Sequence, residues 1–290
     1  MRYYYPLEFL TAAFNIFTGK EDKIVAITKY ANKVGIKILP PKFRYSRSGY
    51  QMDKATSKIY KGLESIKYIS SDVAEKLYEM KDQHFDSFID LIKVFPGNSR
   101  MLSILVELGF FEEFGRTQKL LRIVDLYNKY GGKKQIKKEK CDIPEEIIAK
   151  YSTQTPAMYK LTDVDGMLNE LIADIADKDI PLRSRLAAEV EYLGYMSTII
   201  PNNRNLAVVL DSDFKYSPKV KAYLLSTGQQ ITAKIAKKTY TNNPFQNGDV
   251  LSIVTENRPK WKKDENGGWI QDASLGYDIW ITRYSIEEDI

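Results

Sequence analysis

Apolar residues recur at helical spacing through most of the first 130 residues of the chain. This periodicity predicts short helices over residues 7–16, 22–34, 56–65, 71–80, 85–94 and 99–108. Gly, Ser, Asp or Pro-Gly punctuates the intervals between them. Residues 36–41 are expected to be extended, because a residue before proline is pushed out of the helical region. Short helices joined by tight turns predict a helical-hairpin unit.

The pattern changes to that of strands after Pro201. Segments rich in β-branched and aromatic residues cover residues 205–211, 219–226, 230–236, 249–255 and 276–284. Thr-Gly, Asn-Gly and Asn-Gly-Gly turns bound these segments. About five short strands in roughly 90 residues predict a small closed barrel of the OB type. The expected fold class is therefore α+β and multidomain, with an N-terminal all-α helix-hairpin-helix region and a C-terminal OB-like β-barrel.

Two segments of biased charge lie between the helical and strand-rich parts. Residues 129–140 hold six lysines and one glutamate around a Gly-Gly pair, which predicts a flexible basic linker and a domain boundary. Residues 161–191 hold eight Asp/Glu against three Lys/Arg, with helices expected over 164–176 and 182–193. We expect this acidic segment to face protein or solvent rather than phosphate.

Composition narrows the functional classes. With 290 residues, of which 43% are hydrophobic, the chain can bury more than one core. Its single cysteine, Cys141, and single histidine, His84, exclude an internal disulfide framework and a Cys/His zinc site. No apolar run approaches the ~18 residues of a membrane span, and the start of the chain lacks the layout of a signal peptide. A soluble, cytoplasmic protein without membrane contact is expected.

The barrel segment carries a basic and aromatic pattern. Residues 215–263 contain ten Lys/Arg against two Asp/Glu, interleaved with aromatic rings. Cations that follow phosphates and rings that stack on bases, at about 1–3 kcal/mol each, are the means of binding single-stranded nucleic acid. The candidate residues are Tyr223, Lys234, Lys237, Lys238, Tyr240, Arg258, Lys260, Trp261, Lys262 and Lys263. The last five are expected in one turn-like loop. The alternative is that the rings fill the barrel and the lysines solvate its outside.

The segment from Gly62 to Leu77 has the outline of a helix, a tight hairpin and a second helix. Backbone N–H groups at a helix N-terminus can hold a phosphate oxygen without reading base sequence. This part is therefore expected to grip the backbone of duplex DNA.

Several stretches resemble, in order and spacing, the bacterial DNA polymerase III alpha subunits, which form the C-family of replicative polymerases. Tyr-Pro-Leu-Glu-Phe at residues 5–9, followed by Ala12-Ala13, resembles that family's Tyr-Pro-x-Glu-Phe segment at the end of the fingers domain. Gly-Ile at 35–36 with Leu-Pro-Pro at 39–41 and Ser46 resembles its Gly-Ile-x-x-Leu-Pro-Pro segment.

Three further stretches continue the resemblance. Gly62-Leu63 with Ile66-Lys67 resembles the entrance to the family's helix-hairpin-helix motif. Its second half is matched by Asn98, by Leu-Gly-Phe-Phe at 108–111 and by Arg116. Glu-Val-Glu-Tyr-Leu-Gly-Tyr-Met-Ser at 189–197 resembles the segment that leads into the family's OB domain. The resemblance extends to about Arg116 in detail and is architectural in the barrel.

The resemblance implies a domain order and a set of duplex-contacting residues. It divides the chain into a fingers-like end at 1–45, a helix-hairpin-helix domain at 46–130, the basic linker and acidic helices at 131–200, and the OB-like barrel at 201–290. The duplex-contacting candidates are Lys67, Tyr68, Ser70, Ser71, Asn98, Arg100 and Arg116. The family's hairpin has glycine at the positions of Tyr68 and Ser70, so duplex gripping is expected here either to be weakened or to be carried by Lys67 and Ser71 instead.

The resemblance also implies that the chemistry lies elsewhere. Phosphoryl transfer in this family depends on palm-domain aspartates that hold metal ions, and the chain begins downstream of them. Two Asp-x-Asp pairs, Asp163/Asp165 and Asp211/Asp213, lack a third carboxylate nearby. No catalytic residue, metal or cofactor is therefore expected, and the chain is expected not to be an enzyme on its own.

The expected function is the DNA-binding portion of a DNA polymerase III alpha-type polymerase, bacterial or phage. It would contact duplex primer-template through the hairpin and single-stranded template through the barrel, with a separate palm-containing polymerase chain as partner. An alternative is a phage-encoded protein-interaction or inhibitor protein that retains this polymerase-derived fold. A third possibility, an autonomous enzyme, would require a metal site that the sequence does not reveal.

Overall fold

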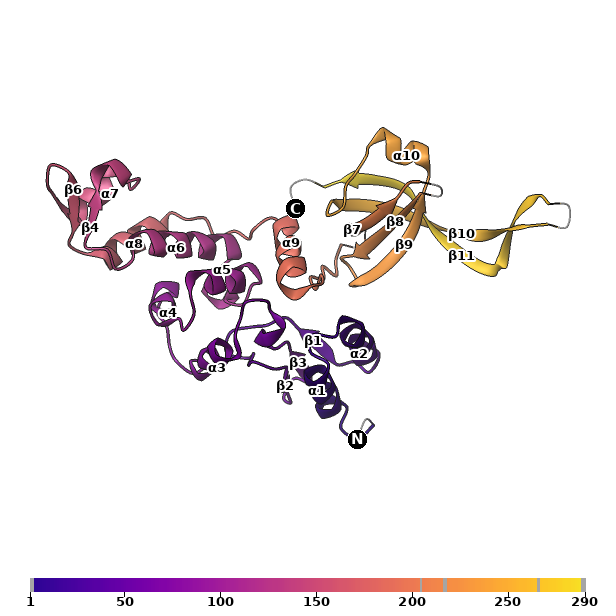
Figure 1. Cartoon of the computed structure of the whole chain (residues 1–290), viewed down its shortest axis with the longest axis horizontal. Coiled ribbons are helices and arrows are strands. Elements are labelled where there is room, and N and C mark those ends of the chain that lie inside the picture. Colours follow the sequence, from indigo (N-terminus) through magenta and orange to yellow (C-terminus); the bar gives the residue numbers. More distant parts are fainter. Residues whose placement is uncertain (1–2, 204, 216–217, 265–266, 288–290) are drawn as a thin grey trace. The chain divides into compact units, whose positions relative to one another are not determined.

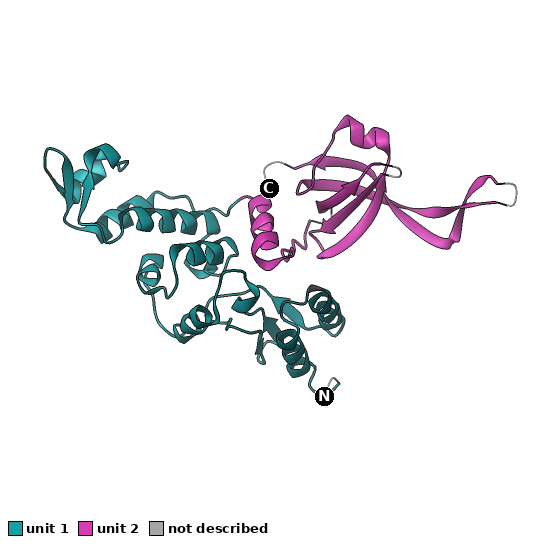
Figure 2. Cartoon of the chain, viewed as in Figure 1, with its two compact units in different colours: residues 1–180 teal, residues 181–290 magenta. Residues whose placement is uncertain are grey.

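The computed structural model describes residues 3–203, 205–215, 218–264 and 267–287. The chain forms two compact units, residues 1–180 and 181–290 (Figure 2). The division falls at 180/181, whereas the sequence pattern places boundaries at 130/131 and 200/201. Helix α9 (Leu182–Leu193) belongs with the second unit because Leu182 and Leu186 pack in one core with Leu206, Val208 and Tyr223.

The first part of unit 1 combines two helices with a small sheet. Helices α1 (Pro6–Ile16) and α2 (Glu21–Lys33) pack with the strands β1 (Lys37–Leu39), β2 (Gln51–Asp53) and β3 (Lys58–Tyr60). The strand order is β1-β3-β2, with β1 parallel and β2 antiparallel to β3. The two expected helices at 7–16 and 22–34 are confirmed.

The helix expected over residues 56–65 is wrong. Those residues form β3 and the single 3-10 turn η1 (Leu63–Ser65). Ile59 and the adjacent Tyr60 are both buried, and β3 is the central strand of the sheet, so pairing with β1 and β2 decides the structure of this segment. Gly62 then permits a close approach of two backbones, because a Cβ there would lie 2.4 Å from the carbonyl oxygen of Ser48.

The middle of unit 1 is helical, as expected. It comprises α3 (Ser71–Glu79), α4 (Phe88–Val94), α5 (Ser99–Glu107), the 3-10 turn η2 (Glu112–Phe114) and α6 (Thr117–Tyr130). Helix α4 begins three residues later than the predicted start because Ser87 and Asp90 form a capping box. The rings of Phe43, Phe88, Phe110, Phe111 and Phe114 contact one another in a buried cluster beneath these helices.

The end of unit 1 contains a second small sheet. Its three strands are β4 (Gln135–Lys137), β5 (Ser152–Gln154) and β6 (Met158–Leu161). The 3-10 turn η3 (Lys138–Lys140) and α7 (Glu145–Lys150) connect β4 to β5, and α8 (Val164–Ala173) follows β6. The strand order is β4-β6-β5, all antiparallel. The prediction of a flexible linker at 129–140 is therefore wrong. Ile136 is buried and pairs with Tyr159, so part of the lysine-rich segment forms strand β4.

Unit 2 is a closed barrel of five strands with α9 before it (Figure 1). The strands are β7 (Leu206–Asp213), β8 (Lys219–Leu224), β9 (Gln229–Ile235), β10 (Val250–Lys263) and β11 (Trp269–Ile286). The ring runs β7-β8-β9-β11-β10 and closes by antiparallel pairing of β10 with β7, while β9 and β11 are parallel. Helix α10 (Lys237–Asn242) joins β9 to β10. The α+β class and a small C-terminal β-barrel are confirmed. The expectation of an all-α N-terminal region is wrong, because two small sheets lie among its helices.

The far ends of β10 and β11 leave the barrel as a two-stranded ribbon, which we call the ribbon (Figure 1). It comprises residues 258–263 and 269–278, whose pairing continues beyond the barrel with a register shift between Pro259 and Lys260. No helix in the described part of the chain is long and apolar enough to cross a membrane.

A buried carboxylate joins α9 to the barrel, and its removal should destabilise unit 2. Glu189, 4% exposed, accepts hydrogen bonds from Ser197 N, Thr198 N and Thr198 Oγ1 at 2.6–3.0 Å. Changing Glu189 to Ala leaves these donors without their acceptor, so we expect a loss of roughly 2–3 kcal/mol in the free energy of unfolding.

The measurement is urea denaturation followed by tryptophan fluorescence, which reports unit 2 alone because all three tryptophans lie in it. The control is Glu191→Ala, an exposed carboxylate on the same helix, which should change stability by less than about 0.5 kcal/mol. Equal effects of the two substitutions would contradict the role given to Glu189.

Candidate nucleic-acid interface

Two loops of unit 1 each lead into the capped N-terminus of a helix. The first loop, residues 66–70, precedes α3, and Ser70 accepts a hydrogen bond from Val73 N at 3.4 Å. The second loop, residues 95–98, precedes α5, and Asn98 accepts one from Met101 N at 3.0 Å. A polar cap satisfies one backbone donor and leaves others of the first turn for an anion. We call the pair the hairpin loops.

A contact between Tyr68 and Arg100 joins the hairpin loops. The guanidinium carbon of Arg100, in the first turn of α5, lies 4.1 Å from the ring centroid of Tyr68. Tyr68 is 53% exposed and has φ of 71°, in the left-handed region that favours glycine. The backbone of Tyr68 thus has the left-handed conformation that would explain a glycine at this position. Unlike glycine, the tyrosine also has a ring, which contacts the guanidinium of Arg100. At Ser70 φ is −83°, so the backbone conformation there does not require glycine.

The remaining hairpin candidates divide into two groups. Lys67 and Ser71 are exposed beside Tyr68. Arg116 instead lies at the start of α6, where its Nη1 atom is 2.6 Å from Asp179 Oδ2 and its backbone N–H donates to Asp177. The hydrogen bond with the Asp179 carboxylate raises the pKa of Arg116, and this carboxylate neutralises the arginine's charge within unit 1. The structure brings Lys67, Tyr68, Ser71 and Arg100 to one region and leaves Arg116 with a carboxylate.

An ion pair holds the segment before β2 against α3. Arg47 Nη2 lies 2.9 Å from Glu75 Oε2, and this hydrogen bond holds the pKa of Glu75 below its ordinary value. The Arg47 carbonyl accepts the N–H of Leu63, the first residue of η1. Arg47 therefore links η1, which precedes the first hairpin loop, to α3, which follows the loop.

Three of the residues expected to bind single-stranded nucleic acid instead make contacts within unit 2. Tyr223 is 5% exposed and donates its hydroxyl hydrogen to the carbonyl of Thr198 at 3.1 Å; burial raises its pKa to about 12. Tyr240 stacks on Phe214 with ring centroids 3.7 Å apart. Lys234 Nζ pairs with Asp278 Oδ2 at 2.5 Å. The expectation that Tyr223 stacks on a base is wrong, because neither of its faces reaches the surface.

Lys237 and Lys238 are exposed on α10, as a contact with phosphate requires. Lys238 lines a shallow hollow with Asn242, Asn243 and Arg283, together with Thr239, Thr282 and Tyr284. These lining residues, all described, include no carboxylate. Arg283 is a cation of this surface that sequence reasoning missed, because a strand residue near the end of the chain carries no local signal.

The turn-like loop expected at 258–263 is wrong, because these residues are the last part of β10 in the ribbon. Arg258 pairs with Glu256 at 3.0 Å and lies 5.1 Å from the ring of Trp280. Lys262 forms an ion pair with Asp272 across the ribbon. Lys260 and Lys263 form no ion pair with another described residue. The basic cluster therefore lies on a strand with two faces rather than around one loop.

Trp269 is an exposed aromatic residue of the ribbon that sequence reasoning missed. It is 63% exposed and pairs directly with Lys263, whose Nζ lies 5.7 Å from its ring. Trp261 is 50% exposed. The Asn-Gly-Gly turn at residues 266–268 was the signal that could have located Trp269, because a hairpin centred there places residues 263 and 269 opposite each other.

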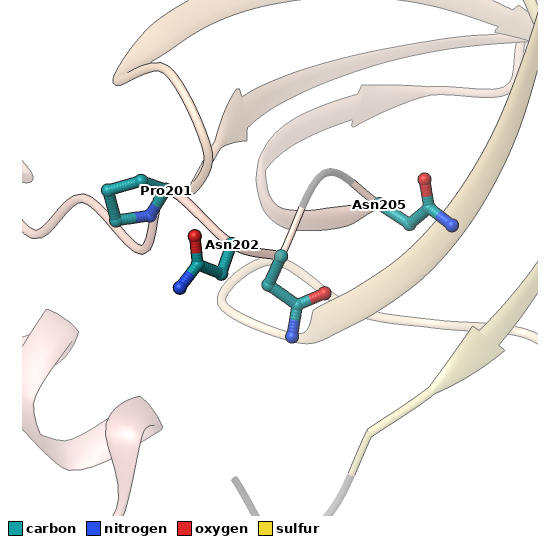
Figure 3. Close-up of a pocket in the computed structure, with 4 residues that line it drawn as sticks. Pro201, Asn202 and Asn205 are labelled. Carbon is teal, nitrogen blue, oxygen red and sulfur yellow. The ribbon is translucent and has the colours of Figure 1, made fainter.

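Two other features hold no candidate chemistry. A hollow lined by Pro201, Asn202, Asn203 and Asn205 is polar, but its carboxamides spread along the loop instead of converging on one point (Figure 3). Within the described ranges, no three His, Cys, Asp or Glu side chains gather to hold a metal ion. Asp163 caps α8 and Asp165 pairs with Lys93 at 2.7 Å.

Comparison with known proteins places the hairpin loops in a recognised motif. Residues 35–121 match the family model of a helix-hairpin-helix motif. The chain is 34% identical over 128 residues to the DNA polymerase III subunit alpha of Campylobacter jejuni, which covers 42% of this chain and 11% of that protein. The subunit of Thermus aquaticus is 30% identical over 123 residues, covering 41% of this chain and 10% of that protein.

A longer match extends beyond the motif. The DNA polymerase III subunit alpha of Chlamydia pneumoniae is 26% identical over 253 residues, which is 81% of this chain and 19% of that protein. The chain thus spans between a tenth and a fifth of the length of these relatives. The resemblance to the downstream part of bacterial DNA polymerase III alpha subunits is confirmed.

The backbone at Tyr68 yields a stability prediction. A residue with a Cβ costs roughly 1–2 kcal/mol in the left-handed region, and glycine avoids this cost. Part of the benefit of glycine is lost because glycine has greater conformational freedom in the unfolded chain. We therefore expect Tyr68→Gly to be more stable than Tyr68→Ala by about 1 kcal/mol in urea denaturation followed by circular dichroism. At Lys76, inside α3, the order should reverse, with Gly less stable than Ala by about 1 kcal/mol. The same order at both positions would contradict the assigned conformation.

The ribbon yields a pKa prediction. Lys262 and then Ser274 donate hydrogen bonds to Asp272, which lowers the pKa of Asp272 to about 2. In Lys262→Ala the carboxylate loses its largest stabilising partner, so its pKa should rise toward the ordinary value of about 3.9. Carboxyl-carbon NMR titration measures this directly. Lys263→Ala, a change on the other face, should leave the titration nearly as it is; an Asp272 pKa that is the same in all three proteins would exclude the ion pair.

Proposed function

We propose that this chain is the DNA-binding region of a DNA polymerase III alpha-type protein. It grips the duplex of primer-template through the hairpin loops and holds single-stranded template through the barrel and ribbon. The observation that carries the proposal is the Tyr68–Arg100 contact, which joins two helix N-termini inside the segment that matches the helix-hairpin-helix motif.

The hairpin loops offer what a phosphodiester backbone needs. Two capped N-termini supply backbone N–H donors and the positive ends of two helix dipoles. Lys67 and Arg100 add two exposed cations. Neither kind of contact reads base edges, so the binding is independent of sequence and suits an enzyme that copies any template.

Single-stranded template requires a different surface, because unpaired bases expose faces that a duplex hides. The ribbon provides exposed indoles and cations, and Lys237 and Lys238 add charge on α10. We assign the single strand to unit 2 on this chemistry. The residues of the barrel wall that were also candidates, Tyr223 and Lys234, are used within the barrel.

In this proposal the chain does not perform nucleotide transfer by itself. That reaction needs carboxylates that hold metal ions, which we assign to a palm-bearing polymerase chain as the partner. The setting is the cytoplasm, with DNA as ligand and no cofactor of its own.

The acidic segment at 161–191 gives the protein-interaction alternative less support than its composition indicates. The acidic segment uses its carboxylates inside unit 1: Asp165 pairs with Lys93, Glu170 with Lys150, and Asp179 with Arg116. These ion pairs leave less acidic surface for a basic partner protein than the composition indicates.

The test is fluorescence-anisotropy binding of the whole chain to duplex, primer-template and single-stranded DNA across a salt series. Because phosphate contacts release counterions, affinity should fall steeply with salt, and primer-template should bind most tightly. Arg100→Ala should weaken duplex binding by about fivefold or more and reduce the salt slope by about one. The matched control is Arg122→Ala, an exposed arginine on α6.

A double-mutant cycle tests the carrying observation. If the Tyr68 ring orients Arg100 toward phosphate, the losses from Tyr68→Ala and Arg100→Ala should not add. Absence of DNA binding at low salt would overturn the proposed function. Binding that Arg100→Ala leaves unchanged would remove the hairpin loops from it.

A further inference from the structure

We propose that the end of the ribbon is a base-stacking site, in which Trp261 and Trp269 receive neighbouring unpaired bases of a single-stranded nucleic acid. The inference rests on the proposed function and deepens it, because it locates the single-strand contact on one face of the ribbon. It includes Trp269, which the basic cluster at 258–263 does not contain.

The register of the ribbon puts both indoles on one face. Trp261 pairs with Gln271, and Lys263 pairs with Trp269, without a register shift between the two rows. Directly paired residues of an antiparallel ribbon point to the same side, as do residues two apart on one strand. We call the face formed by these four side chains the indole face.

The indole face is exposed, and its neighbours are polar. Trp261 is 50% and Trp269 63% exposed, so large apolar rings remain in water at a cost that packing against a partner would remove. Lys263 lies 5.7 Å from the Trp269 ring, where it can meet a phosphate next to a stacked base. Gln271 adds a hydrogen-bonding side chain.

The opposite face of the same ribbon has a different character. It carries Lys260, Lys262, Ile270 and Asp272, because these residues alternate with those of the indole face. There Lys262 and Asp272 neutralise each other. The aromatic surface is therefore confined to one side, and the two faces provide a test and its control within the same four residue pairs.

The size and charge of the indole face favour nucleotides over a protein partner. Two half-exposed indoles present on the order of 200–300 Å², well under the roughly 800 Å² that each partner of a stable protein complex contributes. A nucleobase is a flat ring of similar size, and base-on-aromatic stacking needs only one such face. Lys263, which forms no ion pair with another described residue, complements the phosphates that link the bases.

A duplex cannot use this site, since its base faces are covered by stacking within the helix. The site therefore discriminates single from double strands by access to base faces, and it reads no base identity because every base has such a face. The hairpin loops, which contact phosphates, have the complementary preference.

The experiment measures binding of the full chain to a labelled oligothymidylate of about ten nucleotides and to a duplex. Trp261→Ala and Trp269→Ala should each weaken single-strand binding about fivefold or more, with duplex binding within twofold of the unchanged chain. Ile270→Ala, the neighbouring residue on the opposite face, is the matched control and should change both affinities by less than twofold. All three positions are exposed on the ribbon, away from the barrel core.

A second measurement separates stacking from charge. Replacing two adjacent thymidines in the oligonucleotide by abasic sites keeps the phosphates and removes the rings. The unchanged chain should prefer the intact oligonucleotide, and the double variant Trp261→Ala/Trp269→Ala should lose that preference. Single-strand binding that is equal in the unchanged chain and all variants would overturn the stacking site while leaving the proposed function standing. Failure of the unchanged chain to bind any DNA would overturn both.

Discussion

The phenylalanine cluster of unit 1 is the interaction on which the candidate duplex interface depends. Phe43, from the segment after β1, contacts Phe110 and Phe111 after α5, while Phe88 of α4 contacts Phe111 and Phe114. Helices of seven and nine residues, such as α4 and α5, are not stable alone in water. Burial of these rings at about 1.5–3 kcal/mol each supplies what the helices lack. The position of the second hairpin loop, at the N-terminus of α5, follows from this core, and the contact of Arg100 with Tyr68 joins the first loop to it.

Unit 2 obeys a different constraint, the closure of its sheet. Strand β7 pairs with both β8 and β10, and β9 pairs with β11, so the barrel has no free edge along these segments. Strands β10 and β11, with 14 and 18 residues, are much longer than β7 with eight. The surplus forms the ribbon, which has no second layer to cover it. Residues of the barrel must fill a core, as Tyr223 does, whereas residues of the ribbon are released from packing and can keep their rings in water.

The sequence predicts those elements whose signal is local. Helices α3 and α5 follow Ser70 and Asn98 as capping residues, and the barrel strands follow from β-branched segments between turns. Prediction from the sequence fails where pairing with a distant segment determines the secondary structure. Strand β4 exists because Ile136 pairs with Tyr159, 23 residues later, and no pattern within the lysine-rich segment shows this. At the candidate sites, residue types alone could not separate Tyr223, which is buried, from Trp261, which is exposed; only the register and the barrel wall distinguish them.

The tyrosine at position 68 changes how a hairpin of this kind can hold phosphate. With glycine in the left-handed conformation, a phosphate oxygen can approach the loop backbone without meeting a side chain. A ring at this position occupies space beside the loop, and the same ring orients the guanidinium of Arg100 from the second helix. Contact through a guanidinium reaches farther than contact through an N–H group, and it carries a full charge with paired donors. In the proposed duplex contact, the interface therefore relies less on an exact backbone approach and more on electrostatic attraction, which salt screens. The proposal thus assigns the main phosphate contact to Arg100 of α5 rather than to the loop backbone before α3.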